Sequence, residues 1–154
     1  MADLLNNTNS NANNYGDDAI VTLSPREHIR LRPGMYVGVV GDGSQPDEAL
    51  YVLIKEVVDN SIDEFIMGAG RQIDITLADN VVTVRDYGRG IPLKSLAAAV
   101  GQMNTGGKYG GDAFKKTVGL NGVGVKAVNM LSSEFTARSV RDGEARTVTF
   151  AQGL

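Results

Sequence analysis

The longest stretch with a helical pattern of apolar positions covers residues 47–67. At 100° per residue, one face gathers these side chains: Leu50, Ile54, Val57, Val58, Ser61 and Phe65. The opposite face carries Glu56, Asn60 and Asp63, which are spaced i, i+4 and i+7 and lie within about 60° of one another. Gly68 and Gly70 follow, as is typical after a helix end. The pattern predicts a long amphipathic helix with a polar stripe.

Alternating apolar and polar positions predict two β-hairpins, 73–77 with 81–86 and 134–140 with 146–150. Shorter helices are expected over 92–100 and from about 123 to 131. Another begins at Ser24-Pro25-Arg26-Glu27, which supplies an N-cap, an N1 proline and an N3 glutamate, and it must end before Pro33. A turn and a short extended piece are expected over 35–38. Helices and antiparallel strands in separate blocks favour a two-layer α+β sandwich.

Composition limits the class of protein. The 154 residues, 42% of them apolar, suffice for one domain and not comfortably for two. The absence of cysteine excludes disulfides, thiolate catalysis and cysteine-bound zinc, and a single histidine, His28, excludes a histidine-rich metal site. No apolar run reaches the roughly 18 residues of a membrane span, and no signal peptide opens the chain. No membrane partner is expected.

The net charge of −3 resides in residues 1–18, which hold three aspartates and no lysine or arginine. The rest of the chain is balanced, so charge alone gives no case for direct nucleic-acid binding. Residues 1–18 are also rich in asparagine and cannot bury enough apolar surface to offset their ordering entropy. We therefore expect a flexible arm over 1–18 and a domain over 19–154.

The polar stripe of the long helix is the first candidate for chemistry. Glu56 could accept a proton from an attacking water or orient it, and Asn60 could present a neutral oxygen to Mg²⁺. The alternative is that the stripe is only the solvated face of the helix, which is the commoner outcome for this spacing.

The second candidate is the segment from Asp86 to Pro92, directly after a predicted strand. Gly88 and Gly90 let the backbone turn sharply and approach a flat ligand. Asp86 could accept a hydrogen bond from an exocyclic amine such as that of adenine. The alternative is an ordinary strand-to-helix turn with an Asx-type bond.

The third candidate is a glycine-rich stretch. Glycine accounts for 19 residues, and eight fall between Gly101 and Gly124, which suits either a flexible linker or a phosphate-binding loop. Gly119-Leu120-Asn121-Gly122-Val123-Gly124 leads into a predicted helix, whose first amides can bind an anion. It matches neither a Walker A loop nor a Rossmann fingerprint. Lys108, in Thr105-Gly106-Gly107-Lys108, adds a cation.

The order and spacing of these three segments resemble the GHKL (Bergerat-fold) ATPases. Within them, the RPGMYVG run at 32–38 and the EVVDNSIDE run at 56–64 resemble the B subunits of bacterial type II topoisomerases, DNA gyrase B and topoisomerase IV B alike. The resemblance covers about residues 20–132. It implies a mixed, mostly antiparallel sheet with helices on one face, truncated at the C-terminus. A mismatch-repair or chaperone ATPase is the second hypothesis, although these lack the RPGMY segment. A non-catalytic interaction domain is the third.

The resemblance also implies roles for individual residues. Glu56 would be the general base for ATP hydrolysis, Asn60 the Mg²⁺ ligand, and Asp86 the partner of the adenine amine. Arg89, paired with Glu64, would wall the base pocket. Lys108 and the amides of 120–124 would hold the phosphates, with residues 103–118 as a lid. The other residues expected to contact nucleotide are Tyr15, Asp63, Gly90, Ile91, Pro92, Met103, Phe114, Gly119, Leu120, Asn121, Gly122, Val123 and Gly124.

Partners follow from the same resemblance. The arm would cross to a second B protomer, where Tyr15 would touch that protomer's ATP. The topoisomerase A subunit and DNA would be engaged through the full-length protein, in the bacterial cytoplasm with the nucleoid, and aminocoumarin-type inhibitors would compete with ATP. The family's transducer domain, its catalytic lysine and its DNA-cleaving portion lie outside these 154 residues. Slow or no turnover is therefore expected of the chain in isolation.

Overall fold

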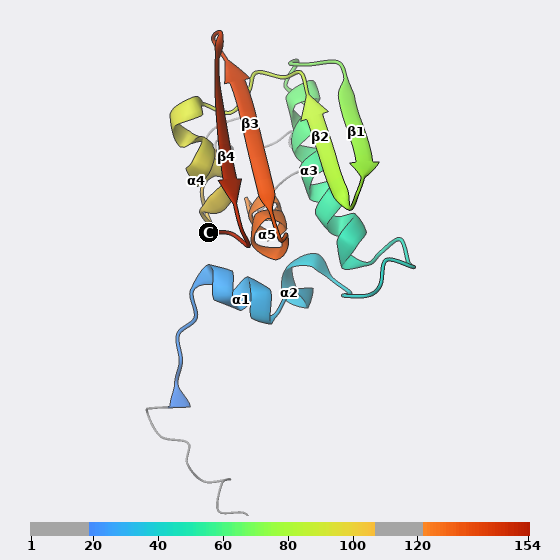
Figure 1. Ribbon diagram of the computed structural model, residues 1–154, viewed down its shortest axis with the longest axis vertical. Helices are drawn as coiled ribbons and strands as arrows, with labels where there is room; N and C mark the ends of the chain where they lie inside the picture. Colours follow the sequence, from blue (N-terminus) through green and yellow to red (C-terminus); the bar gives the residue numbers. More distant parts are fainter. Residues whose placement is uncertain (1–18, 107–121) are drawn as a thin grey trace, which may run out of the picture.

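The computed structural model describes residues 19–106 and 122–154, and it has the α+β fold that the sequence predicts. The helices that follow residue 48 lie on one side of two β-hairpins, and the helices that precede it lie beyond one end of the hairpins (Figure 1). The elements in chain order are α1 (Pro25–Leu31), α2 (Gly34–Val37), α3 (Ala49–Ile66), β1 (Ile73–Ala78), β2 (Val81–Asp86), the 3₁₀ helix η2 (Leu93–Ser95), α4 (Leu96–Gly101), α5 (Gly124–Leu131), β3 (Phe135–Arg141) and β4 (Glu144–Phe150).

Both predicted hairpins are present as two-stranded antiparallel sheets. Ile73 lies opposite Asp86 in the first, and Phe135 lies opposite Phe150 in the second. Their turns have positive φ at both central residues, 50° and 61° at Asp79 and Asn80 and 53° and 80° at Asp142 and Gly143. Such turns match the right-handed twist of the strands. Helix α3 packs against β2, and α4 packs against both β3 and β4.

The apolar core is small and centres on α5. Its buried apolar side chains come from α1, α2, α4 and α5: Ile29, Val37, Leu96, Val100, Ala127 and Met130. The expected apolar face of α3 is less uniform, since Leu50 and Phe65 are 54% and 60% exposed, whereas Asp59, Ser61 and Asp63 are buried. The reason is that α2, α5 and β2 all contact this helix, so its burial does not follow one stripe.

The expectation of an extended piece over 35–38 is wrong, because residues 34–37 form the short helix α2. Pro33 adopts helical angles, φ −58° and ψ −36°, and its carbonyl accepts from the Val37 amide at 3.0 Å. Proline is well suited to a helix start, because it has a fixed φ and no N–H is needed there. The helix ends at Gly38, whose φ is 75°.

Helices α1 and α2 are fastened to the rest of the domain by polar contacts. Arg30 donates from Nη1 to the Met130 carbonyl at 2.8 Å, at the C-terminal end of α5, where a cation is favoured by the helix dipole. His28 Nδ1 and Tyr36 Oη lie 2.6 Å apart and link α1 to α2.

No helix within the two described ranges has both the length and the apolar content to cross a membrane.

Ser24 caps α1 as the sequence predicts. Its hydroxyl accepts from the Glu27 amide at 3.3 Å, and the Glu27 carboxylate accepts from the Ser24 amide at 2.8 Å. We expect Ser24→Ala to lower the free energy of unfolding by about 1 kcal/mol, since a donor at the helix start loses its acceptor. Urea denaturation measures this, with Ser133→Ala, an exposed serine outside the helices, as the control. Equal stability of the two variants would contradict the capping role.

Candidate functional site

The polar stripe of α3 meets the start of α5 at Glu56 and Gly124. A Cβ atom placed on Gly124 would overlap Glu56 Oε2 and would lie 2.6 Å from its Cδ. Only glycine therefore leaves room for the Glu56 carboxylate at this position. The first helical bonds of α5 are donated by Lys126 and Ala127 to the Val123 carbonyl, so the amides at 123–125 have no acceptor within the helix. The Glu56 carboxylate therefore lies directly beside the N-terminus of α5.

Asn60 lies one turn along α3 from Glu56 and is exposed. Its Nδ2 donates to the Glu56 carbonyl at 2.7 Å, which turns Oδ1 away from that carbonyl. Glu56 is half-buried, and Asp63 is only 2% exposed. The stripe is therefore not a uniformly solvated face, because Asp63 is buried and Glu56 is half-buried.

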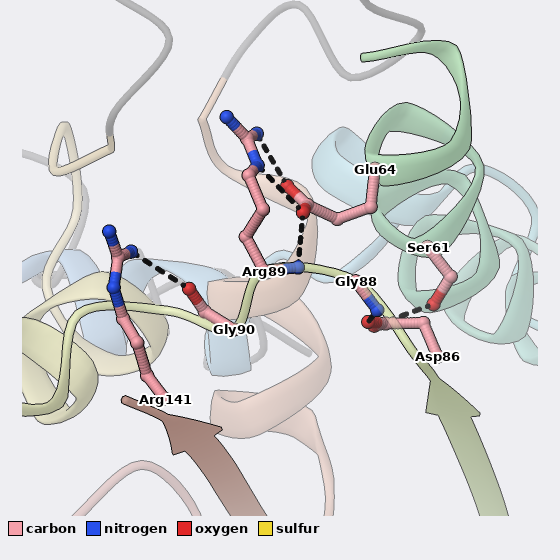
Figure 2. Close-up of polar contacts among 7 residues, drawn as sticks. All are labelled: Ser61, Glu64, Asp86, Gly88, Arg89, Gly90 and Arg141. Atoms are coloured by element: carbon pink, nitrogen blue, oxygen red, sulfur yellow. Dashed lines mark hydrogen bonds and ion pairs between the residues drawn. The ribbon is translucent and has the colours of Figure 1, made fainter. Parts of the chain in front are cut away.

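The Asp86 carboxylate is fixed by two hydrogen bonds (Figure 2). Oδ1 accepts from the Gly88 amide at 2.9 Å, and Oδ2 accepts from the Ser61 hydroxyl at 3.3 Å. The first is the Asx-type bond that was the alternative to a ligand site. The second joins the end of β2 to α3, and the side chain stays exposed. Ser61 was not predicted as a site residue; the only signal was a small polar residue within an apolar face.

The predicted pairing of Arg89 with Glu64 is confirmed (Figure 2). Arg89 donates from Nη2 to Glu64 Oε1 at 2.8 Å and from Nε to Oε2 at 3.1 Å, and its backbone amide donates to Oε2 at 3.0 Å. The hydrogen bonds to Glu64 raise the pKa of Arg89. A Cβ on Gly88 would come within 2.9 Å of the Glu64 Cβ. The pair therefore holds the loop after β2 close against α3.

The other side of this loop contacts the β3–β4 hairpin. Gly90 has a φ of 73°, and a Cβ there would overlap the Val140 carbonyl oxygen. Arg141 donates to the Gly90 carbonyl at 3.2 Å (Figure 2). Ile91 is 39% exposed and Pro92 is exposed, so both present surface beside the loop. The residues from Asp86 to Pro92 thus run between α3 and β3.

A buried lysine that the sequence did not single out lies in the first turn of α5. Lys126 is 4% exposed, and its Nζ donates to the Thr105 carbonyl at 2.7 Å. This bond holds the turn after α4, which also contains the half-buried Met103, against α5. Gly122, with a φ of 61°, and Val123 lead into α5 as predicted. The predictions for Tyr15, Lys108, Phe114, Gly119, Leu120 and Asn121 fall outside the described residues.

A cavity of about 240 Å³ opens beside Asp86, between the C-terminal end of α3 and the start of β1. Among the predicted site residues that the structure describes, Asp86 alone lines it, together with Ser61, Phe65, Ala69, Gly70, Arg71, Gln72 and Ile73. Within residues 19–106 and 122–154, no three or more histidine, cysteine or acidic side chains group as a metal site would require. An Mg²⁺ ion that is held by one or two side chains, a phosphate and water does not require such a group.

Comparison with protein families identifies a family of ATPases. The model described as the histidine kinase-, DNA gyrase B- and HSP90-like ATPase matches residues 45–152, which include α3, both hairpins and α5.

Curated relatives and solved structures point in the same direction. The chain is 56% identical over 140 residues to the B subunit of DNA topoisomerase 4 from Borreliella burgdorferi, covering 91% of this chain and 23% of that protein. It is 41% identical over 137 residues to the B subunit of DNA gyrase from Mycolicibacterium smegmatis, covering 84% and 20%. The ATPase region of Saccharomyces cerevisiae topoisomerase II has the same fold, with a TM-score of 0.77 at 22% identity over 90% of this chain and 45% of that one. The chain thus spans about a fifth of the length of these curated relatives.

Proposed function

We propose that this chain, which belongs to the family of histidine kinase-, DNA gyrase B- and HSP90-like ATPases, is the ATP-binding region of the B subunit of a bacterial type II topoisomerase. In this proposal residues 19–154 form part of the ATP-binding domain and residues 1–18 an arm. The names of the relatives and the length of chain aligned with them support the assignment to a B subunit.

The observation that carries the proposal is the contact between Glu56 and the start of α5. Amides without a helical acceptor and the positive end of the helix dipole favour a phosphate at 123–125. Glu56 lies against Gly124, at the edge of that place, where its carboxylate can accept a proton from a water attacking the terminal phosphate. Glycine at 124 is what permits both groups to occupy the same site.

Asn60 fits the role of a Mg²⁺ ligand. Its Nδ2 donates to the Glu56 carbonyl, and the atom of this side chain that can bind a cation is the amide oxygen, because the amide nitrogen is a donor. Mg²⁺ takes oxygen ligands and is commonly bound by one or two side chains with the remaining positions filled by phosphates and water. Bound there, the ion would neutralise charge on the phosphates. Asn60 would hold the ion, and the half-buried Glu56 lies one turn of α3 away.

Asp86 supports recognition of adenine. Its carboxylate is fixed in place by the Gly88 amide and the Ser61 hydroxyl, yet it remains exposed beside the Gly90–Pro92 surface. Each carboxylate oxygen has more than one acceptor direction, so it can also accept a hydrogen bond from the amine of a base. The pair Arg89–Glu64 closes one side of the same loop.

We expect Asp86→Asn to weaken binding of a non-hydrolysable ATP analogue with Mg²⁺ by roughly 10- to 100-fold, because a charged acceptor for the adenine amine is lost. Isothermal titration calorimetry on the folded chain measures it. Asp79→Asn, in the turn between β1 and β2, is the matched control and should bind as the parent does. Absence of binding by the folded parent, or equal affinity of Asp86→Asn and the parent, would contradict the proposal.

The activity of the whole protein is part of the same proposal. ATP binding would drive dimerisation with a second B protomer through the arm, and hydrolysis would accompany DNA strand passage with the topoisomerase A subunit, in the bacterial cytoplasm. The ATP site would also accept aminocoumarin-type inhibitors. Because the chain spans 23% of the topoisomerase 4 protein that it resembles, we expect these steps to require the remainder of the B polypeptide.

A further inference from the structure

Side chains of the β3–β4 hairpin donate hydrogen bonds to backbone carbonyls of the loop that follows Asp86. Ser139 Oγ donates to the Ile91 carbonyl at 2.8 Å. Arg146 Nη1 donates to the Leu93 carbonyl at 2.8 Å and approaches the Lys94 carbonyl at 3.4 Å. With the bond from Arg141 to Gly90, four carbonyls between residues 90 and 94 accept from this hairpin.

The strand register explains why these donors act together. Ser139 and Arg146 are direct cross-strand partners, so their side chains leave the same face of the hairpin. Phe135 and Phe150 are on that face too, with ring centroids 6.5 Å apart, and β3 there contacts η2 and α4. Ser139 is 5% exposed, which makes its hydroxyl a buried donor committed to one acceptor. A buried donor of this kind is costly to leave without a partner.

The loop has little freedom to move from this position. A Cβ on Gly90 would overlap the Val140 carbonyl oxygen and would lie 3.0 Å from Ser139 Oγ. On the opposite side, Glu64 and Ser61 of α3 hold Arg89 and Asp86 (Figure 2). Helix α3 therefore holds the first half of the loop, at Asp86 and Arg89, and the β3–β4 hairpin holds the second half, from Gly90 onward.

We propose that Ser139 and Arg146 are positioning residues that hold the Gly90–Pro92 surface in the conformation that receives the base of the nucleotide. The inference rests on the proposed function, because it assigns these residues to its base pocket. A loop that is already ordered in the free protein binds its ligand more tightly, because binding then loses no conformational entropy of that loop. Neither side chain needs to touch the nucleotide.

The first test concerns the ligand-free chain. Ser139→Ala removes the donor to Ile91, and Arg146→Met removes the donor to Leu93 and keeps an unbranched stem. We expect exchange of the Ser95 amide, which is bonded to the Pro92 carbonyl at 3.0 Å, and of the Arg89 amide to accelerate roughly fivefold in Ser139→Ala. Thr147→Val removes a hydroxyl from the other face of the same hairpin and should leave both amides unchanged. Unchanged exchange in both loop variants would overturn the inference, whether or not the chain binds nucleotide.

The second test is calorimetry with the non-hydrolysable ATP analogue. We expect Ser139→Ala to bind roughly three- to tenfold more weakly, Arg146→Met at least as weakly, and Thr147→Val as the parent does. Ser139→Thr keeps the hydroxyl and suits a strand, so it should restore affinity. Parental affinity in Ser139→Ala, or failure of Ser139→Thr to restore it, would refute the positioning role. A parent that does not bind the analogue would instead contradict the proposed function.

Discussion

Replacement of Glu56 by glutamine is expected to abolish ATP hydrolysis while nucleotide binding is retained. Glutamine has the shape of glutamate and can accept a hydrogen bond, but it cannot take a proton from water. A positioned general base contributes roughly 10²- to 10⁴-fold to a rate, so the loss of turnover should be at least about 100-fold. Affinity for a Mg²⁺-bound ATP analogue should stay within about threefold or increase, because Glu56 places a negative charge beside the anion site at the start of α5.

Two measurements separate these effects. Calorimetry on the folded chain gives the affinity, and phosphate release by the whole B polypeptide gives the rate. Glu134→Gln, an exposed glutamate just before β3, is the matched control and should leave both unchanged. Hydrolysis by Glu56→Gln within tenfold of the parental rate would remove Glu56 from the role of base. A large loss of affinity would show instead that its carboxylate contributes to binding.

The elements that the sequence predicts well are those whose signal is local. The period of α3 and the alternation of both hairpins are properties of consecutive residues, and so is the Ser24 cap. Helix α2 was missed because Pro33-Gly34 is typical of a turn, yet Pro33 has angles that also begin a helix. The pattern there was compatible with two structures, and packing of Val37 into the core selects one.

The site residues divide in a similar way. Glu56, Asp86 and the Glu64–Arg89 pair belong to motifs in which the residue types and their spacing indicate the chemistry. Ser61, Lys126, Ser139 and Arg146 were not predicted, and the last three donate to backbone carbonyls 21 to 53 residues away. Every residue has a carbonyl, so such an acceptor leaves no mark in the sequence. Only the fold shows which loop a buried serine or lysine holds.

Gly124 provides the second prediction with a large effect, because it links the two motifs physically. An alanine Cβ at this position would overlap Glu56 Oε2 and lie 3.0 Å from Cγ, so the carboxylate has to move. The atoms that give way are the end of a flexible side chain, whereas the helix backbone need not change. Gly124 begins α5 without a positive φ, and alanine is the better helix former by about 1 kcal/mol. The fold of Gly124→Ala should therefore be at least as stable as that of the parent.

The rate of ATP hydrolysis by Gly124→Ala should fall, although its stability does not. Displacing the base by about 1 Å costs on the order of 10²-fold in rate, so we expect Gly124→Ala to lose hydrolysis almost as completely as Glu56→Gln does. The methyl group also narrows the approach to the amides at 123–125, and analogue affinity should fall by roughly tenfold. Thermal denaturation, calorimetry and phosphate release report the three quantities on the same set of variants.

A double-mutant cycle identifies the cause of the loss. If the methyl group acts by displacing the Glu56 carboxylate, Gly124→Ala should reduce the rate little further once Glu56 has been replaced by alanine, since no carboxylate remains to be displaced. The small side chain of Glu56→Ala also makes room for the methyl group. Additive losses in the cycle would mean that the two residues act on hydrolysis independently. A Gly124→Ala enzyme with parental activity would show that the Glu56 carboxylate does not need the place beside α5 that the structure gives it.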